Sequence, residues 1–197
     1  MKTGILISIL IPIMAVLSIF GSCATFQPVG FTIEKGDYVH IYSGMKFPAQ
    51  IGLFQREGVY NYDNTGYDVS ANYKLNEPGQ VLVSVYIYPT SRSTSIIHEF
   101  DKVKAEIVQA HPGANWLGDT EVKHIDGEET VQGKKASYTY VTNFVKRNQQ
   151  VLSYAYLFMR GEWYILYRIT YPQLQHDTVH KEVTNFIQAI DWSCLKI

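Results

Sequence analysis

Alternating apolar and polar positions predict several strands in the first half of the chain. The clearest alternation lies between positions 80 and 88, where one face is entirely aliphatic: Val81, Val83, Val85 and Ile87. Turn residues, including a glycine each time, separate this segment from two similar ones before it. One or two short strands are expected within 31–41, followed by a loop at 45–48. The three hairpin strands are predicted at 53–62, 67–75 and 80–88.

Two segments change to the spacing of an amphipathic helix. The first covers residues 93–110, with one apolar stripe: Ile96, Phe100, Val103 and Ile107. The second covers residues 175–190, with a similar stripe: Val179, Val183, Phe186, Ile187 and Ile190. Four strands are predicted between them, at 116–125, 135–145 (with a segment at 129–131 that leads into it through Gly133), 151–159 and 163–171.

The order of these elements indicates the fold class. Hairpin-length turns require antiparallel neighbours, and each amphipathic helix needs an apolar surface to cover. The sequence therefore predicts an α+β fold, in which an antiparallel sheet of about six to eight strands is covered by two long helices. One such domain is expected over residues 31–197.

The first 22 residues have the pattern of an export signal. Lys2 gives a positive start, residues 5–20 are almost wholly apolar, and Gly21-Ser22 precedes Cys23. A segment of about 20 apolar residues could instead remain as a membrane anchor. Either reading predicts that the folded domain lies outside the cytoplasm.

Phe20-Gly21-Ser22-Cys23 resembles the bacterial lipobox, although Phe20 stands where leucine is usual. The resemblance implies that Cys23 carries lipid after cleavage, with residues 23–30 as a tether. Ala24, rather than aspartate, favours the outer membrane if the source is Gram-negative. Cys194 is then the other cysteine, and we expect it to be a structural thiol.

Composition narrows the function classes. Hydrophobic residues make up 46% of the chain and charged residues 18%, which argues for a folded domain. The formal net charge is −1 and no basic tract occurs, which argues against nucleic acid as a partner.

The histidines provide weak candidate sites. His176 and His180 lie four residues apart on the last predicted helix, a spacing that could hold a divalent metal. No further ligand stands nearby in the sequence, so a solvated helix end is the expected interpretation. His98 and Glu99 lack the second histidine of a zinc protease motif and are expected to face solvent. No nucleophile elbow, phosphate loop or dinucleotide motif occurs. We therefore expect no enzyme, no metal and no cofactor.

The 15 tyrosines are more informative, because three predicted strands each carry a pair on one face. If these faces coincide on the sheet, they form an aromatic surface for a partner or ligand, since tyrosine is enriched at interfaces. The alternative is that the rings pack beneath a covering helix. The candidate surface consists of Tyr86, Tyr88, Tyr138, Tyr140, Tyr154 and Tyr156.

Residues 79–192 resemble the PsbP-like family in the order of their elements. Three local motifs carry the resemblance: Val131 to Tyr138, with its glycine-lysine pair, Tyr164 to Pro172, and the helix end Ile187 to Trp192. The family implies an α/β/α sandwich and an accessory or assembly role without a shared catalytic site.

Together these features favour a membrane-tethered, non-enzymatic binding or accessory lipoprotein of the bacterial cell envelope, with an envelope protein as its partner. One alternative is a carrier with a pocket for a small apolar ligand between sheet and helix. The other is a metal-binding protein or an uncharacterised enzyme.

Overall fold

The computed structural model describes residues 28–33, 35–91 and 95–195. The predicted signal segment and the predicted lipid site at Cys23 lie outside these residues. Among the described residues, no helix has the length and apolar character needed to cross a membrane.

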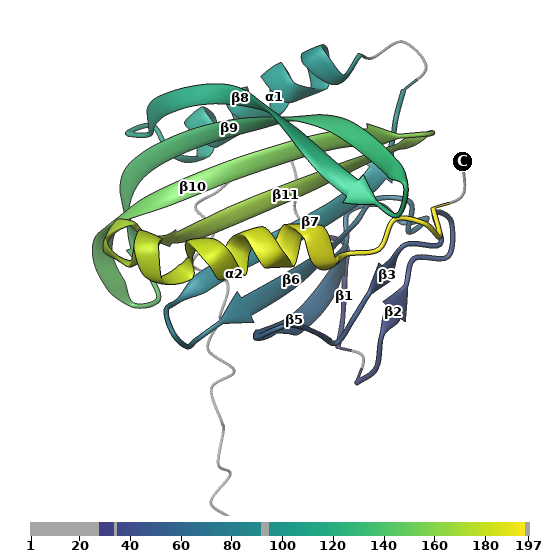
Figure 1. The fold of residues 1–197 in the computed structure, drawn as a ribbon, viewed down its shortest axis with the longest axis horizontal. Helices are drawn as coiled ribbons and strands as arrows, with labels where there is room; N and C mark the ends of the chain where they lie inside the picture. The colour runs from purple at the N-terminus through teal and green to yellow at the C-terminus, as the bar shows by residue number, and fades with distance from the viewer. Residues whose placement is uncertain (1–27, 34, 92–94, 196–197) are drawn as a thin grey trace, which may run out of the picture.

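A nine-stranded antiparallel sheet forms the centre of the described protein (Figure 1). Its spatial order is β1 (Gly30–Thr32), β5 (Phe54–Asn61), β6 (Val69–Leu75), β7 (Val81–Pro89), β11 (Trp163–Pro172), β10 (Arg147–Arg160), β9 (Glu129–Phe144) and β8 (Asn115–Asp126), and β4 (Gln50–Ile51) also pairs with β5. The strand count exceeds the expected range because short strands at the β1 end join the predicted hairpins.

Two helices lie on opposite faces of this sheet, with α2 in front of the strands in Figure 1 and α1 behind them. α1 (Ile96–Ala110) buries its apolar stripe against β9, β10 and β11. α2 (His176–Ala189) follows a short 3-10 turn, η1 (Gln173–Gln175), and packs on the other face. The α+β class and the α/β/α arrangement are thus confirmed.

The strand β11 shows why the sheet needs cover on both sides. Ile165, Tyr167 and Ile169 belong to the core beneath α2. Tyr164 and Leu166, which alternate with them, belong to the core beneath α1. A strand buried on both faces reads as a nearly continuous apolar run, which is the pattern of this segment.

β9 runs through Gly133 as expected, because the missing side chain leaves room for the ring of Phe158 on β10. One expectation about local structure is wrong. The expected loop at 45–48 contains β3 (Lys46–Phe47), which pairs with β2 (Tyr38–Val39) in a separate two-stranded sheet. Burial of the Phe47 side chain in the main core holds this small hairpin in place.

Candidate functional site

The six candidate tyrosines are divided between the two faces of the sheet. Residues that pair directly across antiparallel strands point to the same side. Tyr154 pairs with Ile169 and Tyr156 with Tyr167, which places both tyrosines on the α2 side. The other four lie on the α1 side: Tyr86, Tyr88, Tyr138 and Tyr140. The expectation of one surface made by all six is therefore wrong, because the strand register turns the β10 pair to the opposite face.

Two of the four tyrosines on the α1 side are core residues. Tyr138 and Tyr140 are only 2% and 7% exposed, beneath α1. The ring of Tyr140 stacks on that of His111 at the end of α1, with ring centres 4.0 Å apart. This pair fulfils the packing alternative rather than the surface one.

Tyr86 belongs instead to a row of side chains that crosses the β1 end of the sheet. The strand register places Phe31 opposite Tyr60, Tyr60 opposite Ser70, and Ser70 opposite Tyr86. The ring centres of Phe31 and Tyr60 are 4.6 Å apart, and Tyr62 lies with its ring centre 5.7 Å from that of Tyr86. We call these five residues the tyrosine row.

The tyrosine row is partly open to solvent. Tyr86 packs against the core beneath α1 and Ser70 is buried, whereas among the described residues no helix covers β5 and β6 on this face. Phe31 is exposed, and Tyr60, Tyr62 and Tyr86 are half-buried. The Tyr62 and Ser70 hydroxyls form a 3.0 Å hydrogen bond that fixes the middle of the row. Sequence reasoning missed four site residues, since only the pairing across strands brings them into one row with Tyr86: Phe31, Tyr60, Tyr62 and Ser70.

A hollow of about 290 Å³ lies beside α1, on the same face of the sheet as the tyrosine row, where β7 and β11 meet the helix. Glu99 lines it and is only 7% exposed, so the expectation that Glu99 faces solvent is wrong. Its carboxylate accepts a 3.0 Å hydrogen bond from the Tyr88 hydroxyl and lies 3.5 Å from the ammonium of Lys102. His98, the neighbouring residue on α1, is exposed as expected.

Carboxyl groups with raised pKa values lie at the border between the tyrosine row and α1. Burial and then the negative charge of Asp63 raise the pKa of Asp68 to about 6. Burial also raises the pKa of Glu106 on α1. The pKa of Tyr88 is raised by burial and then by the charge of Glu99. Its hydroxyl therefore stays protonated and can donate hydrogen bonds at neutral pH.

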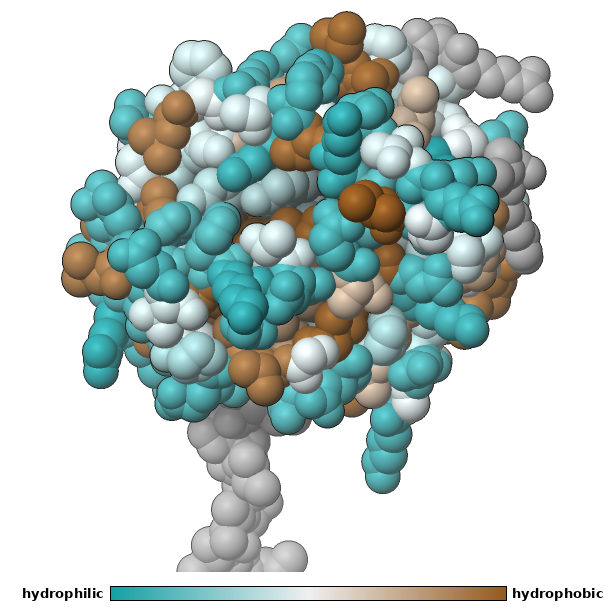
Figure 2. Space-filling model, viewed as in Figure 1, coloured by the Kyte–Doolittle hydropathy of each residue, from teal (hydrophilic) through white to brown (hydrophobic). Residues whose placement is uncertain are grey.

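The tyrosines on the α2 side form a different cluster. The Lys135 ammonium lies 4.5 Å from the Tyr154 ring centre and 5.3 Å from that of Tyr156, within cation–π range. The Tyr171 hydroxyl lies 2.9 Å from Nδ1 of His176. Figure 2 views the molecule from this side, where polar side chains cover most of the surface and apolar ones occur in small groups.

His176 and His180 lie close enough together to bind one metal ion, but the other ligands of a metal site are missing among the described residues. The rings of His176 and His180 are 5.0 Å apart, so the two residues do lie together. Within the described part of the chain, no group of three or more histidine, cysteine, aspartate or glutamate residues could hold a metal ion. Two ligands are fewer than the three or four that zinc sites in proteins use.

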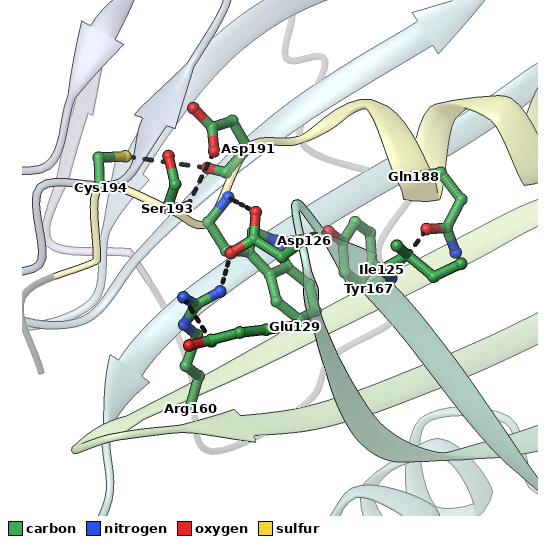
Figure 3. Close-up of polar contacts among 10 residues, drawn as sticks. Ile125, Asp126, Glu129, Arg160, Tyr167, Gln188, Asp191, Ser193 and Cys194 are labelled. Atoms are coloured by element: carbon green, nitrogen blue, oxygen red, sulfur yellow. Dashed lines mark hydrogen bonds and ion pairs between the residues drawn. The ribbon is translucent and has the colours of Figure 1, made fainter.

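A buried polar network joins the end of β8 to the chain that follows α2 (Figure 3). Arg160 forms an ion pair with Asp126 and a second with Glu129 at 3.1 Å. The Trp192 backbone N–H donates to the remaining Asp126 oxygen, and its indole N–H donates to the Tyr167 hydroxyl. Because its charged groups are paired with one another, this cluster fixes the C-terminal segment.

No family model matches the chain, and no curated protein matches it. Solved structures do match. A protein of unknown function from Pseudomonas aeruginosa aligns with a TM-score of 0.51 at 9% identity, covering 71% of this chain and 96% of that one. The solution structure of cyanobacterial PsbP from Synechocystis sp. PCC 6803 aligns with a TM-score of 0.48 at 12% identity, covering 86% of this chain and 96% of that one. A PsbP is thus among the structures similar to this chain, and at these identities the likeness concerns the fold alone.

Proposed function

We propose that this chain is an exported accessory protein, held at a membrane by lipid on Cys23, that acts by binding an envelope protein and not by catalysis. The single observation that carries the binding role is the open tyrosine row. It extends from Tyr86 at the border of α1 to half-buried rings on and just after β5, a part of the sheet face that no described helix covers.

The chemistry of the row suits contact with another protein. A tyrosine ring supplies a large apolar area, and its hydroxyl supplies a hydrogen bond at the edge, which is why tyrosine is enriched at interfaces. Glu99 and Asp68 at the α1 border add acceptors for backbone or basic groups of a partner. The membrane address is carried by the sequence alone, through the signal pattern and Cys23.

Crosslinking in intact cells, followed by purification and mass spectrometry, tests this proposal. We expect a specific envelope protein to be captured by the unmodified chain and lost after Tyr86→Ser. Tyr156→Ser is the matched control, because it removes the same side chain from the opposite face of the sheet. Cys23→Ala should also lose the partner if tethering is required.

The controls separate binding from folding. Thermal unfolding must show that both tyrosine variants remain folded. Equal capture by the wild type and Tyr86→Ser would refute the role of the row, and equal loss in both variants would show that capture does not depend on this face.

The carrier of a small apolar ligand is less well supported. A carrier needs a largely apolar cavity, typically of about 300–1,000 Å³. Two hollows lie beside α1, of about 330 and 290 Å³, at the low end of this range. Both are lined largely by polar or charged side chains: Asp101, Lys104, Asp119, Thr120, Glu121 and Lys134 in the first, and Ser91, His98, Glu99 and Lys102 in the second. Beneath α1 itself, Phe100, Val103 and Ile107 pack directly against the sheet.

A further inference from the structure

Exposed apolar side chains are concentrated close to the predicted tether. Of the fifteen large apolar residues exposed in the described part of the chain, five lie between positions 29 and 41. They are Val29, Phe31, Ile33, Val39 and Ile41. We call these five residues the apolar edge. Such a concentration on a protein surface marks a site of contact with an apolar partner.

The backbone explains why these side chains face outward. β1 is an edge strand that pairs with β5, and Val29 and Ile33 stand two residues before and after Phe31, on the same side of an extended chain. Ile33 is 71% exposed.

The same alternation continues at β2. His40 is buried, and on either side of it in the sequence Val39 and Ile41 point outward. β1 pairs with β5, and the Arg56 guanidinium on β5 donates hydrogen bonds to the backbone oxygens of Gly36, just before β2, and Phe47 on β3. The apolar edge therefore lies on segments held beside β5 (Figure 1).

The length of the tether decides which surface this corner meets. Seven residue steps separate Cys23 from Gly30, and seven steps of extended chain span at most about 25 Å. A folded domain of this size has a diameter of about 40 Å. A lipid on Cys23 therefore keeps β1 near the membrane, whereas the β8 end of the sheet can lie farther from the membrane than the tether is long.

We infer that the apolar edge rests on the lipid surface of the membrane to which Cys23 is anchored. This inference rests on the proposed lipid attachment. The tether keeps the edge at a high effective concentration near the bilayer, so even a small apolar contact is populated. Side chains such as phenylalanine and isoleucine enter the boundary between headgroups and acyl chains. The tyrosine row begins at Phe31 and crosses the sheet away from this edge, which leaves Tyr86 accessible to a partner.

The test uses the full lipid-modified chain reconstituted into vesicles of phosphatidylethanolamine and phosphatidylglycerol with brominated acyl chains. Bromine quenches tryptophan fluorescence only within the bilayer. Ile33→Trp places the probe on the apolar edge. Leu174→Trp is the matched control, because Leu174 is fully exposed just after β11, a strand that three others separate from β1 in the sheet. The signal of the three native tryptophans is subtracted using the unsubstituted chain.

We expect a blue shift and a loss of fluorescence for Ile33→Trp and neither change for Leu174→Trp. Equal quenching of the two probes, or quenching of neither, would overturn the inference. Mass spectrometry of Cys23 in the same preparation separates failure of the lipid attachment from failure of the membrane contact. Absence of lipid would overturn the tether and this inference together, whereas confirmed lipid with an unquenched Trp probe at position 33 would overturn the inference alone.

Discussion

His124 is a histidine that the fold holds in its neutral form. Its side chain is 1% exposed and stacks on the Trp192 ring, with ring centres 3.5 Å apart. Burial and then the positive charge of Arg160 lower the pKa of His124 from 6.5 to about 4, although a hydrogen bond with the Ile187 backbone acts in the opposite direction. In the unfolded chain the imidazole regains its ordinary pKa. The unfolded state therefore binds more protons between pH 6.5 and 4.

The size of the effect follows from linkage. Since the pKa in the folded state is depressed, stability is present above pH 6.5 and is lost as the pH falls toward 4. Between pH 7.5 and pH 5, this one group should reduce the free energy of unfolding by about 2 kcal/mol. His124→Phe replaces the imidazole with a ring that can still stack on Trp192 and cannot be protonated.

Urea unfolding at pH 7.5 and pH 5, followed by tryptophan fluorescence, provides the assay. The wild type should lose about 2 kcal/mol more than His124→Phe between these two pH values. Lost packing or hydrogen bonding in the variant changes the free energy of unfolding equally at the two pH values. The difference in pH dependence between the two proteins therefore isolates the titration of His124. The comparison is required because Asp68 titrates in the opposite sense. An equal pH dependence in the two proteins would refute the assignment to His124.

Three further changes test other parts of the structure, each by equilibrium unfolding in urea. The pKa of Asp68 is raised to about 6, so its carboxyl favours folding below pH 3.8 and this contribution is lost as the pH rises through 6. Between pH 4 and 7.5, the free energy of unfolding of the wild type should therefore fall by about 2 kcal/mol more than that of Asp68→Asn. The same pH dependence in both proteins would contradict this. Asp126→Asn removes the main charged partner of the buried Arg160 guanidinium and should lower the free energy of unfolding by about 2 kcal/mol. An unchanged urea midpoint would contradict this. Gly133→Ala should cost about 1–3 kcal/mol, because a Cβ there would lie 2.3 Å from an aromatic carbon and 2.7 Å from a backbone oxygen. Gly113→Ala meets open space and should be close to neutral, so equal losses in the two alanine variants would refute the steric argument.

The local patterns were sufficient for the two helices, the longer strands and their order. The stripe of α1 is buried at Phe100, Val103 and Ile107, as its spacing predicts. β7 and β11 lie within about a residue of their expected bounds. These features depend on periodicity within one short segment, which the sequence records directly. Ser95 caps α1, because its hydroxyl accepts a hydrogen bond from the backbone N–H of His98.

The candidate site depended on contacts that periodicity does not record. Tyr154 and Tyr156 share a face of their own strand as expected, but which face of the sheet they occupy follows from the pairing of β10 with β11. Likewise Glu99 is buried because Tyr88 on β7 stands beneath it and donates a hydrogen bond.

By itself, the sequence determined the fold class, the succession of hairpins and helices, and the export pattern that ends at Cys23. Only the tertiary structure decided that Tyr86 joins Tyr62 and Phe31 in an open row while Tyr138 and Tyr140 enter the core. The physical reason is that a one-residue change of register moves every side chain of a strand to the other face. That register is fixed by packing between strands far apart in the chain, such as β7 and β11.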